Sequence, residues 1–117
     1  MELSGKWLGM GRIWVGATCC GKAERLFALA SQWAAERKQF GQPIGKFQGT
    51  GFKLADMAVE LRAADLLVND AIAKANEGMM SDADAAMVKL FCSEMLNRVA
   101  DSTMQIYGGM GLMEELP

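Results

Sequence analysis

The middle of the chain carries an uninterrupted run of mainly apolar residues at alternating three- and four-residue steps. An α-helix repeats every 3.6 residues, so this spacing puts all of these side chains on one face of a single long helix. A stripe that continues for about eight turns without a slip is typical of a helix in a bundle. The stripe consists of Phe47, Thr50, Leu54, Met57, Leu61, Ala64, Val68, Ala71 and Ala75.

Similar stripes lie before and after this central helix. The earlier stripe is rich in small side chains, which allow a neighbouring helix to approach closely, and the later stripe begins just behind Ser81, a favourable N-cap residue. The earlier stripe consists of Ile13, Gly16, Cys20, Ala23, Phe27, Ala30 and Ala34, and the later one of Ala85, Val88, Cys92, Met95, Val99, Ser102 and Ile106.

The predicted fold is all-α, an antiparallel bundle of three long helices at Arg12–Gln39, Phe47–Asn76 and Ser81–Tyr107. The connections between them are short, which favours antiparallel neighbours, and no strand-like alternation competes with the helical pattern. A chain of 117 residues supports one domain, so we assign 1–117 to a single helical domain. Residues 1–10 are glycine-spaced, and we expect them to form a partly ordered lead-in.

Charge and composition exclude several classes of function. A formal net charge of -2 gives no broad cationic field for nucleic acid, and no stretch reaches the about 20 apolar residues of a membrane span. The chain has no histidine, which excludes within it a Ser-His-Asp triad and the usual zinc sites, so we expect no metal site. Cys19, Cys20 and Cys92 form no disulfide pattern, and we expect them in the core of a cytoplasmic protein.

Two polar residues flank the turn between the first two predicted helices. Arg37 can neutralise a pyrophosphate, and Gln48 can hydrogen-bond a neighbouring polar group. The same residues are also explained without a ligand, because a cation near a helix C-terminus compensates the helix dipole and Gln48 can simply be solvated. The residues alone leave both explanations open.

A glycine-containing segment, Gln105–Gly109, ends the third predicted helix. Its glycines follow a helix rather than open one, so the anion site of a helix N-terminus is not available here. The glycines can serve as a helix C-cap, and their missing side chains also let another surface approach the backbone. Both explanations can hold at once.

Arg12 begins the first predicted helix, where a positive charge opposes the helix dipole. A salt bridge or a solvated side chain explains this placement, and so does a ligand. Trp14 and Trp33 are predicted to be packing residues rather than an aromatic platform for a ligand. Four acidic residues beside the stripes are predicted to be solvated or in salt bridges: Asp56, Glu60, Asp65 and Glu94.

Four short motifs occur in order along the chain: ERKQFGQPIGKFQ at 36–48, KLADM at 53–57, QIYGGMG at 105–111 and ELP at 115–117. With these motifs the chain, from about Gly9 to Pro117, closely resembles the C-terminal helical domain of the acyl-CoA dehydrogenases. Those enzymes are flavoproteins. The resemblance implies that the three helices are part of a four-helix-bundle-like domain that helps to hold FAD and packs subunits together, so a homo-oligomer is expected.

By this resemblance, one set of residues contacts the FAD of an adjacent subunit. The side chains that match the first motif would lie against the cofactor, and Gln105 with the backbone through Gly109 would meet its adenosine part. Arg12 matches an arginine beside the acyl-CoA site and is assigned to substrate binding. The implied cofactor residues are Arg37, Phe40, Phe47, Gln48, Gln105, Ile106, Tyr107, Gly108 and Gly109.

The resemblance also implies the reaction of the parent protein. A glutamate removes the α proton of an acyl-CoA while the β hydride passes to the flavin, and the electrons leave to an electron-transfer flavoprotein. Some family members carry this glutamate where this chain has Gly11, and most carry it beyond the segment matched by Glu115–Pro117. We therefore assign no catalytic residue, and we expect a fragment that binds and assembles without turnover. The alternative is a freestanding helical interaction module without catalysis.

Overall fold

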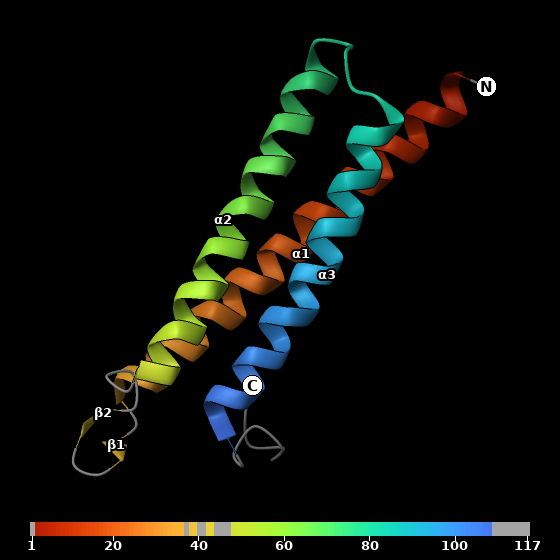
Figure 1. The fold of residues 1–117 in the computed structure, drawn as a ribbon. Helices are drawn as coiled ribbons and strands as arrows, with labels where there is room; N and C mark the ends of the chain where they lie inside the picture. The colour runs from red at the N-terminus through yellow and green to blue at the C-terminus, as the bar shows by residue number, and fades with distance from the viewer. Residues whose placement is uncertain (1, 37, 40–41, 44–47, 109–117) are drawn as a thin grey trace.

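Three long helices form the fold and run along one another in an elongated bundle (Figure 1). α1 spans Glu2–Glu36, α2 spans Gln48–Asn76 and α3 spans Asp82–Tyr107. The structure is a computed structural model that describes residues 2–36, 38–39, 42–43 and 48–108. Its extents are 60 × 26 × 15 Å, because α1, the longest helix, runs along most of the long axis. The predicted all-α class and the three helices are confirmed.

The connections set the directions of the helices. α2 runs antiparallel to α1, and α3 runs antiparallel to α2, so that α1 and α3 are parallel (Figure 1). Two short strands, β1 (Lys38–Gln39) and β2 (Gln42–Pro43), pair antiparallel between α1 and α2, with Lys38 opposite Pro43. As a result, α1 and α3 end where α2 begins (Figure 1). Of the helices that the structure describes, none has the length and apolar character that a bilayer crossing requires.

The predicted stripes form the core of the bundle. In α2 the stripe is buried from Met57 to Ala71, and in α3 it is buried at every position except Ser102, which is half-buried. In α1 the buried positions include three alanines, Ala23, Ala30 and Ala34, which are 0 %, 0 % and 1 % exposed. Such small side chains leave room for α2 and α3 to approach the α1 backbone closely.

The predicted bounds of the first helix are wrong at both ends. α1 begins at Glu2 instead of Arg12, because packing outweighs the cost of about 1 kcal/mol that each glycine adds to a helix. Gly9 shows the reason: it is buried, and a Cβ there would lie 2.8 Å from Cε of Met80. At the other end the helix stops at Glu36, before the expected cations, and the chain turns into β1.

Ser81 caps α3 as predicted. Its Oγ accepts a hydrogen bond from the backbone N–H of Asp84 at 3.1 Å, and the Asp84 carboxylate accepts one from the backbone N–H of Ser81 at 2.9 Å. These bonds and the ammonium group of Lys74, 3.2 Å away, hold the pKa of Asp84 below its usual range. Lys74 also lies 3.1 Å from Asp70, so one amine joins the end of α2 to the start of α3.

All three cysteines lie in the core, as expected. Cys20 of α1 faces Cys92 of α3, with the two Sγ atoms 4.0 Å apart, and both are free thiols. Burial raises the pKa of both thiols, which keeps them protonated at neutral pH. They act here as small packing residues between the two parallel helices.

The prediction for the tryptophans is correct for one of them. Trp33 packs against the core, but Trp14 is 76 % exposed. Trp14 directly follows Ile13, which is 4 % exposed, and successive residues of a helix are turned by about 100°. The side chain therefore leaves the buried face of α1.

Leu61→Ala tests the buried stripe of α2, with Leu90→Ala on α3 as a matched control. Leu61 is 8 % exposed and Leu90 is 58 % exposed. We expect Leu61→Ala to lower the free energy of unfolding by about 2 to 5 kcal/mol in urea titrations, because it leaves a cavity. Leu90→Ala should change it by less than about 0.5 kcal/mol. Equal losses for the two variants would contradict the assignment of the buried face.

Gly16→Ala tests the close approach of α1 and α3, and Gly21→Ala is its matched control. A Cβ at Gly16 would collide with Cγ1 of Val88, whereas in the described part of the chain no atom lies within 4 Å of a Cβ at Gly21. Gly16→Ala should therefore lower the melting temperature, by an overpacking cost of about 1 to 3 kcal/mol. Gly21→Ala should raise it, since alanine is favoured over glycine in a helix by up to about 1 kcal/mol. A stabilising Gly16→Ala would show that α3 is not held against this position.

Candidate functional site

The C-terminal ends of α1 and α3 meet at one end of the bundle. The rings of Trp33 and Tyr107 lie with their centroids 4.7 Å apart at an interplanar angle of 43°. The hydroxyl of Tyr107 donates a hydrogen bond to the backbone carbonyl of Leu29 at 3.4 Å. These contacts hold the last turn of α3 against α1.

α3 ends in a glycine whose backbone lies in the left-handed region. Gly108 has φ 63°, and its N–H donates to the carbonyl oxygens of Met104 and Gln105. This confirms the C-cap explanation, because a residue with a Cβ would be strained at this φ. Gly108 is also exposed, and no atom of the described residues lies within 4 Å of the place of a Cβ, so among the described residues its backbone can be approached by a ligand.

Gln105 is exposed and held by a neighbour on its own helix. Its Nε2 donates a hydrogen bond to Oδ2 of Asp101 at 2.9 Å. An ionised carboxylate only accepts hydrogen bonds, so the NH2 group of Gln105 has to face Asp101. The side-chain carbonyl oxygen is therefore the atom of this amide best placed to accept a hydrogen bond from a ligand. Ile106 differs from Gln105: it is 6 % exposed and belongs to the core, so only its backbone can reach a ligand.

The remaining predicted site residues are distributed as follows. Arg37, Phe40, Phe47 and Gly109 lie outside the described residues, and Gln48 is the first residue of α2, with its side chain outside the description. Arg12 is half-buried in the N-terminal half of α1. At about 1.5 Å per residue it lies roughly 36 Å from Glu36, so it is not part of this end of the bundle.

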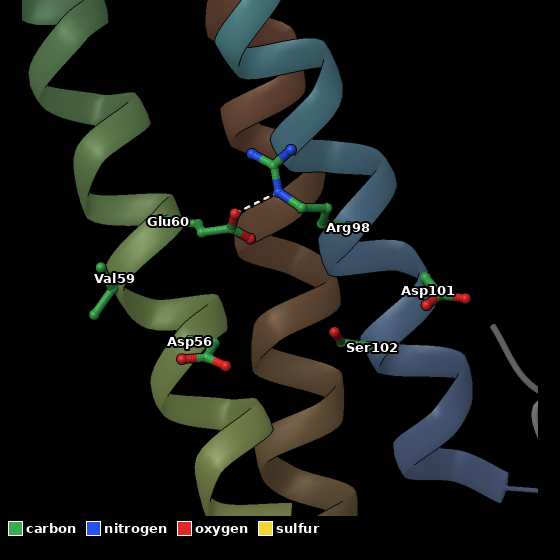
Figure 2. Close-up of a pocket in the computed structure, with 6 residues that line it drawn as sticks. All are labelled: Asp56, Val59, Glu60, Arg98, Asp101 and Ser102. Atoms are coloured by element: carbon green, nitrogen blue, oxygen red, sulfur yellow. Dashed lines mark hydrogen bonds and ion pairs between the residues drawn. The ribbon is translucent and has the colours of Figure 1, made fainter.

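A polar hollow of about 360 Å³ lies between α2 and α3 (Figure 2). The Arg98 guanidinium donates to the Glu60 carboxylate across the two helices, lies 3.9 Å from Glu94, and stands 5.8 Å from the ring centre of Phe91. Two of the acidic residues are thus in salt bridges, as predicted. Carboxylates already surround the Arg98 guanidinium. Its ion pairs therefore join α2 to α3 and do not offer a free charge to a ligand. Its lining consists of Asp56, Val59, Glu60, Arg98, Asp101 and Ser102.

A second, largely apolar groove of about 660 Å³ lies between α1 and α3. Sequence reasoning missed it and also missed the Trp33–Tyr107 contact, because a helical period shows which face of a helix is buried but not which helix covers it. The glycine after Tyr107 was the available signal for the end of α3. The groove is lined by Gly21, Lys22, Arg25, Leu26, Leu29, Leu96, Asn97 and Ala100.

The chain is similar to several characterised proteins. It is 44 % identical over 107 residues to the short-chain specific acyl-CoA dehydrogenase of Megasphaera elsdenii, which covers 92 % of this chain and 28 % of that protein. It is 41 % identical over 110 residues to the 3-(aryl)acrylate reductase of Clostridium sporogenes, covering 94 % of this chain and 29 % of the relative. A subunit of the caffeyl-CoA reductase-Etf complex of Acetobacterium woodii is 38 % identical over 110 residues, with coverages of 94 % and 29 %.

Solved structures show the same fold. The butyryl-CoA dehydrogenase of Megasphaera elsdenii superposes with a TM-score of 0.94 at 41 % identity, over 99 % of this chain and 30 % of that one. A chain in a structure described as the electron transferring flavoprotein of Acidaminococcus fermentans superposes with a TM-score of 0.91 at 40 % identity, with coverages of 96 % and 30 %.

The chain thus spans less than a third of the length of these relatives. The sequence model of the acyl-CoA dehydrogenase C-terminal domain matches residues 1–117, which is the whole chain. With the three-helix fold and these relatives, that match shows that the chain belongs to the acyl-CoA dehydrogenase family, as a C-terminal domain.

Proposed function

We propose that this chain is the FAD-binding and subunit-packing part of a flavin-dependent acyl-CoA dehydrogenase, which desaturates an acyl-CoA thioester between its α and β carbons. The main observation in support of the proposal is that the C-terminal ends of α1 and α3 meet, through the contact between Trp33 and Tyr107. This contact places Gly108, at the end of α3, beside the end of α1 at Glu36. Arg37 is the next residue of the chain.

In the proposal, residues at this end of the bundle contact the pyrophosphate and adenosine parts of FAD. The side-chain carbonyl of Gln105 can accept a hydrogen bond, and the backbone at Gly108 can be approached closely. In the proposal, Arg37 neutralises the pyrophosphate, and Phe40, Phe47 and Gln48 complete the contacts. The reactive flavin ring is held by residues outside this chain, across a subunit contact.

The parent enzyme in this proposal acts on an acyl-CoA, with Arg12 beside the substrate. It passes its electrons to an electron-transfer flavoprotein. Two of the similar proteins support such a partner: one is a subunit of a caffeyl-CoA reductase-Etf complex, and the other is a chain in the electron transferring flavoprotein structure from Acidaminococcus fermentans. The catalytic glutamate is supplied by a segment other than these 117 residues, so the chain alone binds and assembles without turnover.

Subunit packing is supported by an outer stripe on α2, which we define as Phe52, Val59 and Leu66. These residues follow one another at seven-residue steps, opposite the buried stripe, and are 62 %, 68 % and 57 % exposed. Figure 2 shows Val59 pointing away from α3. An exposed row of large apolar side chains is typical of a face that another protein surface covers.

Arg37→Ala in the full-length enzyme tests the cofactor assignment. Removing a charge-assisted hydrogen bond should raise the dissociation constant of FAD by about tenfold or more, as followed by flavin fluorescence in titrations of the apoenzyme. Added FAD should restore part of the lost activity. The chain of 117 residues alone should purify colourless and show no acyl-CoA oxidation.

Two arginines of α1 serve as comparisons. Arg12→Ala should reduce kcat/KM for the acyl-CoA without releasing flavin, because it is assigned to the substrate. Arg25→Ala removes an exposed cation from the same helix and should leave both FAD affinity and turnover unchanged. An Arg37→Ala enzyme that binds FAD as tightly as the parent would remove Arg37 from the site.

Val59→Glu tests the packing role of the outer stripe. We expect the chain to form a dimer or tetramer in sedimentation experiments, and we expect a charge at Val59 to shift it toward monomer, since a buried unpaired carboxylate is costly. Ala58→Glu is the control, because it places the same charge at an exposed position turned by about 100° from Val59. A parent chain that stays monomeric at high concentration would rule out assembly through this face.

The alternative, a freestanding interaction module, also uses exposed apolar faces. The reading frame of the gene separates the two: flanking sequence that encodes the remaining acyl-CoA dehydrogenase domains excludes a freestanding module. A cytoplasmic location remains a prediction of the sequence, to be checked by cell fractionation.

A further inference from the structure

We propose that Trp33 is a positioning residue: through Tyr107 it fixes the last turn of α3 and so the direction in which Gln105 and Gly108 face a dinucleotide cofactor. The identity of the cofactor rests on the proposed function. The positioning itself rests on contacts within this chain, which join residues that are 74 positions apart in the sequence.

The last turn of α3 has two inward anchors. Ile106 is 6 % exposed in the core, and Tyr107 is half-buried against Trp33. Their neighbours Met104, Gln105 and Gly108 are exposed. The turn is therefore held from one side, and the groups offered to a ligand lie on the other side.

Two anchors hold this turn more firmly than one. Consecutive residues of a helix point about 100° apart, so Ile106 and Tyr107 contact the bundle in two different directions. Together they hold the helix end against α1. Without the contact to Trp33, the described contacts of this turn would be reduced to the burial of Ile106 and the hydrogen bond from Tyr107 to Leu29, and helix ends that lose tertiary contacts fray more.

The backbone at this end depends on the same turn. The N–H of Gly108 donates to the carbonyls of Met104 and Gln105, and these bonds exist only while the last turn keeps its helical shape. Gln105 is likewise held by Asp101, one turn earlier on α3. Fraying of the turn would therefore move both the amide of Gln105 and the open backbone at Gly108.

Trp33 also belongs to the last turn of α1, three residues before the helix ends at Glu36. The aromatic contact therefore joins the last turn of one helix to the last turn of the other. Trp33 thus sets the spacing between the end of α1 at Glu36 and the residues Gln105 and Gly108 at the end of α3.

The first experiment uses the 117-residue chain without any cofactor. We expect Trp33→Leu to increase the hydrogen-exchange rate of the amides of residues 105–108 by about two- to tenfold, the usual range for loss of an aromatic pair. Trp33→Phe keeps a ring and should restore most of the protection. Phe91→Leu is the matched control, because Phe91 is a partly buried aromatic residue of α3 about four turns from Tyr107, and it should leave exchange at 105–108 unchanged.

Unchanged exchange at 105–108 in a folded Trp33→Leu chain would overturn the inference, whatever the cofactor is. If Trp33→Leu does not fold, Tyr107→Leu removes the same contact from the other side and is judged by the same criterion. Tyr107→Phe keeps the ring and loses only the hydroxyl contact to Leu29, so it should behave nearly like the parent.

The second experiment measures FAD binding to the full-length enzyme. Trp33→Leu should raise the dissociation constant of FAD by about the same two- to tenfold factor, with Trp33→Phe close to the parent. Gln105→Ala and Gly108→Val test the assignment of FAD to this end separately from the positioning role of Trp33. If these two variants weaken FAD binding and Trp33→Leu does not, the positioning role is wrong. If none of the three affects FAD, the assignment of FAD to this end is wrong, and the exchange result stands alone as the test of the contact.

Discussion

The close approach of α1 and α3 is the constraint on which the rest of this structure depends. It requires a residue without a side chain at Gly16, where a Cβ would collide with Val88, and thiols of modest size at Cys20 and Cys92. Alanines continue the contact face of α1 toward its C-terminus. Because packed interiors tolerate little change in volume, this row of small residues fixes how deeply the two helices seat against one another.

The close packing of α1 and α3 also determines how their C-terminal ends meet. Two parallel helices that stay close along their length also end close together, and here their ends are joined by large residues instead of small ones. Trp33 and Tyr107 fill the space between the last turns, and α3 then stops at Gly108, whose positive φ ends the helix without strain. The same geometry that builds the core thus brings a rigid aromatic contact beside an exposed backbone.

The surfaces that we propose to be functional are exposed on the described part of the chain. The described part of the proposed cofactor end offers hydrogen-bond acceptors and open backbone, while the outer stripe on α2 and the apolar groove between α1 and α3 offer large uncovered apolar surface. In the proposed function a second surface completes each of these faces, because exposed apolar side chains and open grooves are typical of binding surfaces. That agrees with a chain that spans less than a third of the length of its relatives.

The sequence by itself determined the three stripes, the cap at Ser81, the bounds of α2 to within one residue and the end of α3 at Gly108, because all of these depend on local spacing and local hydrogen bonds. Only the tertiary structure decided that α1 begins ten residues early and that Trp14 faces outward while Trp33 meets Tyr107. A helical period tells which residues share a face but not which partner that face meets. The packing energy between distant segments decides this, and at the start of α1 it outweighs the low helix propensity of glycine.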